Sequence, residues 1–209
     1  MKEIRKKIYG EYDPYEGLEL LEPDLQGWAS TSFVFEEVIS AIRPKTIIEV
    51  GTWKGGSAVH MASTCLKYYD DFEILCIDTF LGSVEHWVDQ KELLHKGIKN
   101  GRPSIYEQFL SNVVHRNLQN YITPLPVDSI NGHEILKKLD IVADMIYIDA
   151  GHDYLSVRVD LGYYADHLRL GGYMIGDDWF HIPIKKAAWD TFGQDKVIEK
   201  SHDKFVWIK

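Results

Sequence analysis

Two apolar segments of this chain end abruptly in carboxylates. The run Met-Ile-Tyr-Ile stops at Asp149 and is followed by His152, and the run Gly-Gly-Tyr-Met-Ile-Gly stops at Asp177 and Asp178. In an open parallel sheet, ligands bind beyond the carboxyl ends of the strands, so two neighbouring strands of this kind would bring the four side chains to one rim. Carboxylate oxygens suit Mg²⁺ and similar ions, and a histidine can act as a base near neutral pH. These residues predict a divalent-metal site with a candidate base beside it.

Each of these residues also has a structural interpretation. Aspartate commonly caps helices, and we prefer that interpretation for Asp153. For Asp149, Asp177 and Asp178 we favour function, because three acids that meet without a cation would repel one another and raise their own pKa values. His152 could be a metal ligand, a general base or an ordinary loop residue, and its acidic neighbours favour the first two.

A glycine-rich turn follows a third apolar run. The strand-like sequence Ile-Ile-Glu-Val leads into Gly51, and Gly55, Gly56 and Ser57 begin a helical pattern. Glycines let backbone N–H groups approach a ligand closely, and the helix that follows offers its positive end. The spacing is not Gly-x-Gly-x-x-Gly, which disfavours a dinucleotide-dependent dehydrogenase. The turn predicts a site for a nucleotide-like cofactor, although such glycines are often only structural.

Further polar residues follow the next two predicted strands. Asp78 ends a strand 27 residues after Gly51, where an acid can accept both hydroxyls of a ribose. Its structural alternative is a turn residue or a cap. Asp128 and Ser129 would lie next along the rim, where an adenine could pack, or Ser129 could cap the following helix.

The composition limits the classes of partner. The 209 residues suggest one domain, and the formal charge of −9 argues against nucleic acid or an anionic membrane as the main partner. The first residues lack the apolar core of a signal peptide, and no apolar run is long enough to cross a membrane. Cys65 and Cys76 lack metal-ligand spacing, and we expect both as reduced, buried thiols. These features predict a cytoplasmic protein.

Apolar strands and helical patterns alternate along the chain, which predicts a doubly wound α/β sandwich that ends in an antiparallel hairpin. The strand at 121–127 carries two prolines and is expected at a sheet edge. A helix is predicted over 154–170, closed by Gly171 and Gly172. The predicted strands cover residues 46–50, 73–77, 121–127, 143–149 and 173–176, with the hairpin at 196–208.

Two segments break this alternation. Residues 1–30 are expected to form an arm or short helices, and residues 1–27 could form a lid or a homo-oligomer contact. Residues 79–103 form a long polar stretch without clear structure, which is typical of a lid or binding loop. His86 in this stretch is expected at the surface or in packing, and His181 is a weaker candidate for the pocket wall. The rim aromatics could shape an acceptor pocket or belong to the core: Trp53, Phe80, Trp87, Trp179 and Phe180.

Together the motifs resemble a known family. Glu49–Ser57 resembles the first motif of class I S-adenosylmethionine-dependent methyltransferases, and Asp78 lies where their ribose-binding acid falls. The segments Ile148–Tyr154 and Leu170–Asp178 resemble the metal-dependent O-methyltransferase branch. The likeness is greatest to macrolide and aminocoumarin sugar O-methyltransferases and weaker to catechol and caffeoyl-CoA O-methyltransferases. It extends from about Trp28 to the C-terminus.

The resemblance implies a fold and a set of site residues. The fold would be a Rossmann-like, doubly wound, seven-stranded and mostly parallel sheet of order 3-2-1-4-5-7-6, with strand 7 antiparallel, in a three-layer αβα sandwich formed by the single domain 1–209. The residues implied for S-adenosylmethionine are Glu49, Gly51, Thr52, Gly55, Ser57, Asp78, Thr79, Asp128, Ser129 and Asp149. Those implied for Mg²⁺ or a similar divalent cation are Asp149, Asp177 and Asp178.

The resemblance also implies the reaction. His152 or Asp149 would take the proton of a small-molecule hydroxyl, with a sugar or another vicinal diol as the favoured acceptor, and the oxygen would attack the sulfonium methyl in line. The alternatives are a related α/β enzyme with other chemistry, such as an N-methyltransferase or a hydroxylase-like relative, and a cofactor-binding protein without turnover. Binding of the methyl donor and sensitivity to metal removal separate these hypotheses.

Overall fold

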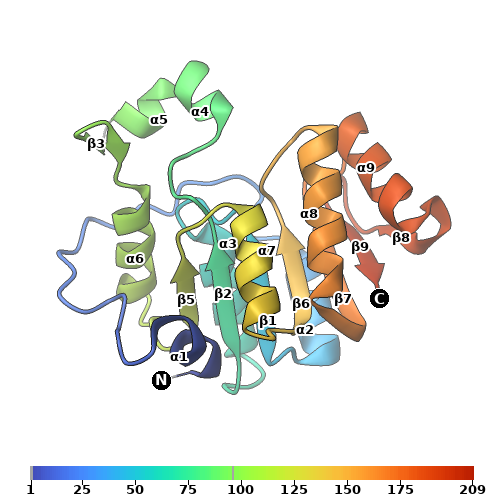
Figure 1. Cartoon of the computed structure of the whole chain (residues 1–209), viewed down its shortest axis with the longest axis horizontal. Helices are drawn as coiled ribbons and strands as arrows, with labels where there is room; N and C mark the ends of the chain where they lie inside the picture. The colour runs from blue at the N-terminus through green and yellow to red at the C-terminus, as the bar shows by residue number, and fades with distance from the viewer. Residues whose placement is uncertain (1, 96) are drawn as a thin grey trace.

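The computed structural model describes residues 2–95 and 97–209, and their centre is one seven-stranded sheet (Figure 1). Its strands are β1 (Thr46–Val50), β2 (Glu73–Ile77), β5 (Ile122–Leu125), β6 (Ala143–Ile148), β7 (Leu168–Gly176), β8 (Val197–Glu199) and β9 (Phe205–Ile208). They pair in the order β5-β2-β1-β6-β7-β9-β8, and β9 runs antiparallel to both of its neighbours. The predicted strand order and its antiparallel last strand are confirmed, and β5 with its proline lies at the expected edge.

Helices cover both faces of the sheet, which makes the predicted three-layer sandwich (Figure 1). One layer consists of α2 (Phe33–Ile42), α3 (Gly56–Cys65) and α6 (Ile105–His115). The other consists of α7 (Ser129–Lys138), α8 (Tyr154–Asp166) and α9 (Ile182–Phe192), together with the short α1 (Glu3–Tyr9). Among the described residues, no helix is long and apolar enough to cross a bilayer.

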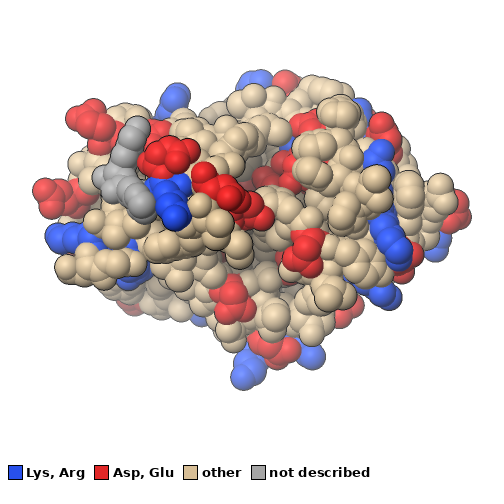
Figure 2. Space-filling view, turned by 90° about the horizontal axis from the view of Figure 1, so that it is seen from above, with Lys and Arg blue, Asp and Glu red and all other residues tan. Residues whose placement is uncertain are grey.

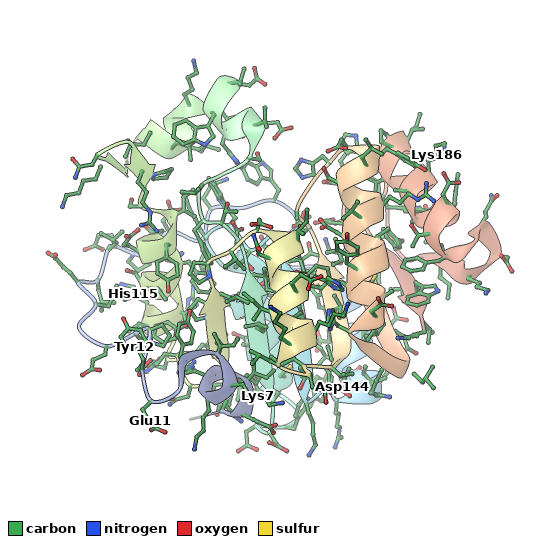
Figure 3. The ribbon with its side chains drawn as sticks, in the orientation of Figure 1. Lys7, Glu11, Tyr12, His115, Asp144 and Lys186 are labelled. Carbon is green, nitrogen blue, oxygen red and sulfur yellow. The ribbon has the colours of Figure 1, made fainter. Side chains whose placement is uncertain are left out.

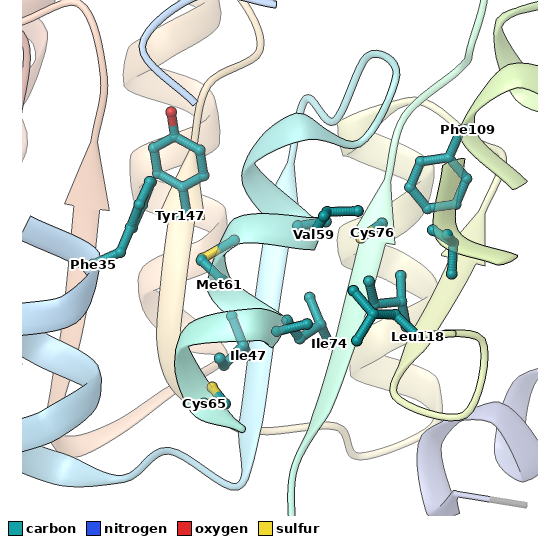
Figure 4. Close-up of a cluster of buried hydrophobic side chains, with 14 of the residues drawn as sticks. Phe35, Ile47, Val59, Met61, Cys65, Ile74, Cys76, Phe109, Leu118 and Tyr147 are labelled. Atoms are coloured by element: carbon teal, nitrogen blue, oxygen red, sulfur yellow. The ribbon is translucent and has the colours of Figure 1, made fainter. Parts of the chain in front are cut away.

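The two faces of the sheet bury separate apolar clusters because side chains alternate along a strand. In β1, Ile47 packs towards α2 and α3, whereas Ile48 and Val50 pack towards α7 and α8. Figure 4 shows the first cluster, in which Phe35 meets Tyr147 edge-on at 4.9 Å between ring centroids. Both cysteines are free and buried in this cluster, as predicted.

The structure corrects the predicted end of the helix over 154–170. Helix α8 ends at Asp166, and Gly171 and Gly172 lie within β7 rather than at a helix terminus. The pairing of β6 with β7 shifts register between Ala143 and Met145, which is the signature of a bulge. Glycine suits this bulge, because a Cβ on Gly172 would lie 2.9 Å from a backbone oxygen of Asp144.

The two irregular segments contain more structure than their sequence suggests. The insertion 79–103, whose residue 96 lies outside the described residues, holds α4 (Val84–Val88), α5 (Lys91–His95) and a small hairpin of β3 (Ile98–Lys99) with β4 (Arg102–Pro103). These elements rise above α6 at one side of the sheet (Figure 1).

The N-terminal arm packs on its own chain. The backbone N–H groups of Ile4 and Arg5 donate to the Glu73 carboxylate, and those of Leu21 and Asp24 donate to side chains of α6. These contacts lead the following residues 27–30 to the carboxyl end of the sheet.

Candidate active site

A large cleft lies at the carboxyl ends of the parallel strands, where open α/β sheets bind their ligands. Its volume is about 990 Å³, and the loops after β1, β2, β5, β6 and β7 line it together with residues 27–30 of the arm. Figure 2 looks onto this end of the molecule and shows its hollow, with carboxylates gathered beside it. The single cleft brings most of the predicted site residues together.

The glycine turn after β1 is built by close packing. Gly51 has a φ of +84°, and a Cβ there would lie 1.9 Å from the backbone oxygen of Asp149, so only glycine lets the β1 and β6 loops meet. Gly55 also has a φ of +84°, and its Cβ would lie 2.8 Å from the Phe109 ring. Gly51 lines the cleft, whereas Gly55 turns towards α6 and is not among the lining residues.

Asp78 organises the same turn. Its Oδ2 accepts hydrogen bonds from the backbone N–H groups of Thr52 and Trp53, both at 2.8 Å, and its Oδ1 accepts one from Phe80 at 2.7 Å. Burial nevertheless raises the pKa of Asp78. The carboxylate lines the cleft beside Thr79, so it combines the predicted turn role with a position at the predicted ribose site.

Glu49 lies beneath the turn rather than in the cleft. It is fully buried on the α3 side of β1, and its carboxylate accepts a hydrogen bond from the Ser57 hydroxyl. Burial raises the pKa of Glu49 to about 7. Ser57 and Thr52 line the cleft, so Glu49 can affect a bound cofactor only through its hydrogen bond with Ser57.

Asp128 and Ser129 line the far end of the cleft, next to the first turn of α7. Asp128 is the helix cap: its Oδ1 accepts from the backbone N–H of Asn131 at 2.9 Å. Hydrogen bonds from Asn131 lower the pKa of this carboxyl group. The alternative in which Ser129 caps the helix is therefore wrong, because Ser129 is already its first residue.

Three side chains meet at the opposite end of the cleft. Potential ligand atoms of Asp149, His152 and Asp178 all lie within 4.8 Å of one another, and His152 Nε2 is 3.2 Å from Asp178 Oδ2. Asp178 has a φ of +55°, which turns its side chain back towards the loop after β6. Asp153 caps α8 through the N–H groups of Leu155 and Ser156, as predicted.

Asp177 accepts hydrogen bonds from groups that lie beneath this cluster. Its Oδ1 accepts from Lys204 Nζ at 2.8 Å and from the Asp178 backbone N–H at 2.8 Å, and its Oδ2 accepts from the Tyr147 hydroxyl at 2.6 Å. Lys204 is fully buried, and the Tyr147 hydroxyl also lies 2.9 Å from Asp149 Oδ2, so its one hydrogen is shared between the two carboxylates. Neither Lys204 nor Tyr147 was among the residues predicted from sequence.

The chemistry of this end fits a divalent cation. Burial, followed by repulsion from Asp177, raises the pKa of Asp149 well above its usual range. Burial also raises the pKa of Asp178. Both shifts arise because carboxylates lie close together with little solvation, and a cation held between their oxygens would relieve this repulsion.

Aromatic side chains form the mouth of the cleft. His86 of α4 stacks on Trp53 at 4.1 Å between centroids, and Trp28 of the arm lies 5.6 Å from His86. All three line the cleft, so His86 packs as expected, and it does so at the rim of the cleft. Phe180 and His181 also line it, whereas Phe80 and Trp179 are buried in the core.

Comparison with known proteins agrees with this arrangement. A family model described as a methyltransferase domain matches residues 48–179, which is more than half of the chain. The span includes the glycine turn, Asp78 and all the acids that follow β6 and β7. No match was found among curated protein sequences.

Solved methyltransferases share the fold. The chain is similar to the O-methyltransferase from Bacillus cereus in complex with SAH, with a TM-score of 0.61 and 13% identity over 90% of this chain and 84% of that one. It is similar to TomG from Streptomyces achromogenes, an O-methyltransferase of tomaymycin synthesis in complex with SAM, with a TM-score of 0.58 and 13% identity over 90% and 83%. The O-methyltransferase NovP gives a TM-score of 0.57 and 21% identity over 84% and 76%.

The prediction of family and fold is therefore confirmed by independent findings. The family match covers most of the segments that form the cleft, and the solved structures share the fold that surrounds it. The chain therefore belongs to the methyltransferase domain family, and its fold is the one that these solved O-methyltransferases share.

Proposed function

We propose that this enzyme transfers the methyl group of S-adenosylmethionine to a hydroxyl oxygen of a small molecule, with the help of a divalent cation. One observation carries the proposal. A single cleft joins the glycine turn at Gly51 to the cluster of Asp149, His152 and Asp178. The turn suits a methyl donor, and the cluster suits an oxygen acceptor.

The donor would lie along the β1 side of the cleft. The backbone at Gly56 and Ser57 begins α3, and the positive end of this ten-residue helix favours the carboxylate of the methionine part. Asp78 and Thr79 lie where the ribose would follow, and Asp128 and Ser129 lie towards the adenine. Glu49 and Gly55 would support this site from beneath without touching the donor.

The acceptor would lie at the acidic end. We assign Asp149 and Asp178 as the carboxylate ligands of a Mg²⁺-like cation. Asp177 would position Asp178, because its Oδ1 accepts a hydrogen bond from the Asp178 backbone N–H. When bound, such a cation would favour the ionised form of a hydroxyl group. Two vicinal oxygens fit such a site, which supports a sugar or another vicinal diol as acceptor.

His152 is the best placed proton acceptor. Its side chain is 43% exposed, and its Nε2 lies 3.2 Å from Asp178 Oδ2, which orients the ring. Asp149, the alternative base, already accepts a hydrogen bond from Tyr147. As the acceptor oxygen bonds to the methyl carbon, the bond from that carbon to sulfur breaks, and the proton goes to His152. Orientation of the two reactants supplies most of the rate enhancement.

The names of structural relatives support an oxygen acceptor. The proteins from Bacillus cereus and Streptomyces achromogenes and NovP are all O-methyltransferases, and TomG acts in tomaymycin synthesis. An N-methyltransferase would have no evident use for two carboxylates and a histidine within 4.8 Å of one another. The same argument disfavours a protein that only binds the donor, because an unused buried acid cluster destabilises the fold.

Calorimetric titration with S-adenosylmethionine tests the donor half of the proposal. We expect saturable binding that also raises the melting temperature, by the equivalent of about 2.7 kcal/mol at a hundredfold excess over Kd. Absence of binding at millimolar concentration would refute the proposal. The acceptor half is tested by offering a panel of diols as acceptors and measuring the S-adenosylhomocysteine that forms from S-adenosylmethionine. This formation should cease with EDTA and return with Mg²⁺.

A further inference from the structure

Glu49 is a carboxylate in the middle of the sheet that is shielded from solvent. Its partners in the strand register are Cys76 of β2 and Tyr147 of β6, both labelled in Figure 4. The side chain is fully buried, and no lysine or arginine of the described residues forms an ion pair with it. A carboxyl group in such surroundings is costly to ionise, so its proton is available to the chemistry of the site.

Other enclosed carboxylates of the chain have a charged partner. Asp177 pairs with the buried Lys204 at 2.8 Å. Asp144, labelled at the lower edge in Figure 3, accepts from two backbone N–H groups and pairs with Arg169. Glu49 differs from both because its hydrogen-bond partners are a neutral hydroxyl and a neutral thiol, neither of which fixes it in the ionised form.

The Ser57 hydroxyl links Glu49 to the cleft. It lies in the first turn of α3, lines the cleft and donates its hydrogen to Glu49 Oε1. A hydroxyl group has one hydrogen, so the Ser57 oxygen can offer the cleft only lone pairs while Glu49 is ionised. If Glu49 holds a proton, its O–H can donate to the Ser57 oxygen, and the Ser57 hydrogen is free to point into the cleft. The protonation state of Glu49 thus decides which kind of ligand group Ser57 can bind.

The other groups that face Glu49 leave it as the one that changes protonation near neutral pH. The Cys76 thiol lies 3.5 Å from Glu49 Oε2, and burial raises the pKa of Cys76 and of Tyr147 well above their usual ranges. Burial raises the pKa of Glu49 to about 7, where Thr52 opposes the rise and the charge of Asp78 adds to it. Glu49 is therefore close to half protonated at pH 7, and a ligand can shift this balance.

We propose that Glu49 takes up a proton from solvent when the methyl donor binds, and that its protonated form turns the Ser57 hydroxyl towards the carboxylate of the donor. The inference rests on the proposed function, which assigns this carboxylate to the start of α3. The carboxylate is negatively charged and accepts hydrogen bonds, so it favours a donating Ser57 with a neutral Glu49 beneath it. Glu49 is in this way a positioning residue that acts through Ser57 and does not touch the donor.

Proton uptake during the binding of S-adenosylhomocysteine tests the inference, because this ligand keeps the carboxylate and lacks the sulfonium charge. Titration calorimetry at pH 7.5 in two buffers with different ionisation enthalpies gives the number of protons bound per ligand. We expect the wild type to take up about 0.7 proton more than Glu49→Gln, whose amide can donate to Ser57 at any pH. The amino group of the ligand contributes equally to both proteins. Relative to this variant, the wild-type Kd should rise about tenfold from pH 6 to pH 8.

Two further variants assign the proton to its residue. Burial raises the pKa of Asp160 on α8 to about 6, so Asp160→Asn removes a second buried acid and should take up protons as the wild type does. Ser57→Ala keeps Glu49 but removes the hydroxyl that links it to the cleft, and it should lose most of the extra uptake.

Three results would overturn the inference: equal uptake in the wild type and Glu49→Gln, release of protons by the wild type, or a ratio of their Kd values that stays constant with pH. Full extra uptake in Ser57→Ala would also overturn it, because Glu49 would then act without Ser57. If S-adenosylhomocysteine does not bind to the wild type at millimolar concentration, the proposed function fails instead.

Discussion

Replacement of Lys204 by methionine probes the acidic end of the cleft most sharply. Lys204 is fully buried, and its Nζ lies 2.8 Å from Asp177 Oδ1. Methionine keeps much of the side-chain length and removes the charge, which leaves the Asp177 carboxylate buried with only Tyr147 and one backbone N–H as donors. Breaking a buried ion pair from one side lowers the free energy of unfolding by about 3–5 kcal/mol.

Thermal unfolding gives the readout. For a chain of this size, each kcal/mol shifts the melting temperature by about 2–4 °C, so Lys204→Met should melt roughly 10 °C lower. The double variant Lys204→Met with Asp177→Asn should regain most of this loss, because no unpaired charge remains buried. Lys186→Met, which breaks an exposed pair on α9, serves as the control and should melt like the wild type.

The same variants separate stability from metal binding. Without Lys204, the Asp177 carboxylate becomes an additional anionic group beside Asp149 and Asp178, so Mn²⁺ should bind more tightly to the folded Lys204→Met protein. The reasoning is refuted if Lys204→Met melts with the wild type, or if the double variant is no more stable than the single one. Either result would mean that the Lys204–Asp177 ion pair does not stabilise the structure beneath the acidic end of the cleft.

Three other predictions follow from the same geometry. Since burial raises the pKa of Glu49 to about 7 from an ordinary 4.5, the folded state binds this proton more tightly, and the free energy of unfolding should fall by about 3 kcal/mol as pH rises from 4.5 to 7. In a pH series of urea denaturations, Glu49→Gln should remove this fall. An unchanged dependence on pH in the variant would contradict the assignment. Gly51→Ala places a Cβ 1.9 Å from the Asp149 backbone oxygen, so calorimetry should show a fold destabilised by about 3 kcal/mol or more and weaker metal binding. A melting curve like that of the wild type would show that the two loops do not pack this closely. Asp178→Asn should weaken Mn²⁺ binding about tenfold or more and leave the Kd for S-adenosylmethionine nearly unchanged, and equal losses of both would mean that the two halves of the cleft are not separate.

The sequence predicts the sheet well, and it predicts which acids lie together at one rim, because both depend on local patterns. Each buried parallel strand is a short apolar run, and the residue that ends the run necessarily lies at the carboxyl edge. Asp78, Asp149 and Asp178 can therefore be assigned to one rim from the sequence alone. The bulge at Gly171 and Gly172 escapes such reasoning because its glycines resemble a helix terminus when the pairing with β6 is unknown.

The residues that support the site are harder to predict. Lys204 follows a polar turn, where a lysine is normally solvated, and its burial depends on pairing with Asp177, which lies just after β7. Glu49 belongs to the motif that implies donor binding, but the alternation of side chains along β1 turns it towards α3. Strand alternation alone could have identified that position. The role of His86 depends on the fold of the insertion, whose polar sequence gives no periodic signal.

We propose that one cleft holds a methyl donor and a divalent cation side by side. Paramagnetic relaxation of the S-adenosylmethionine methyl protons by bound Mn²⁺ tests it directly, because the effect requires both ligands on the same molecule and falls steeply with distance. We expect strong relaxation, which Mg²⁺ should abolish by competition and which Asp178→Asn should greatly reduce. Relaxation no greater than that of free Mn²⁺ in solution, with the donor bound, would contradict it.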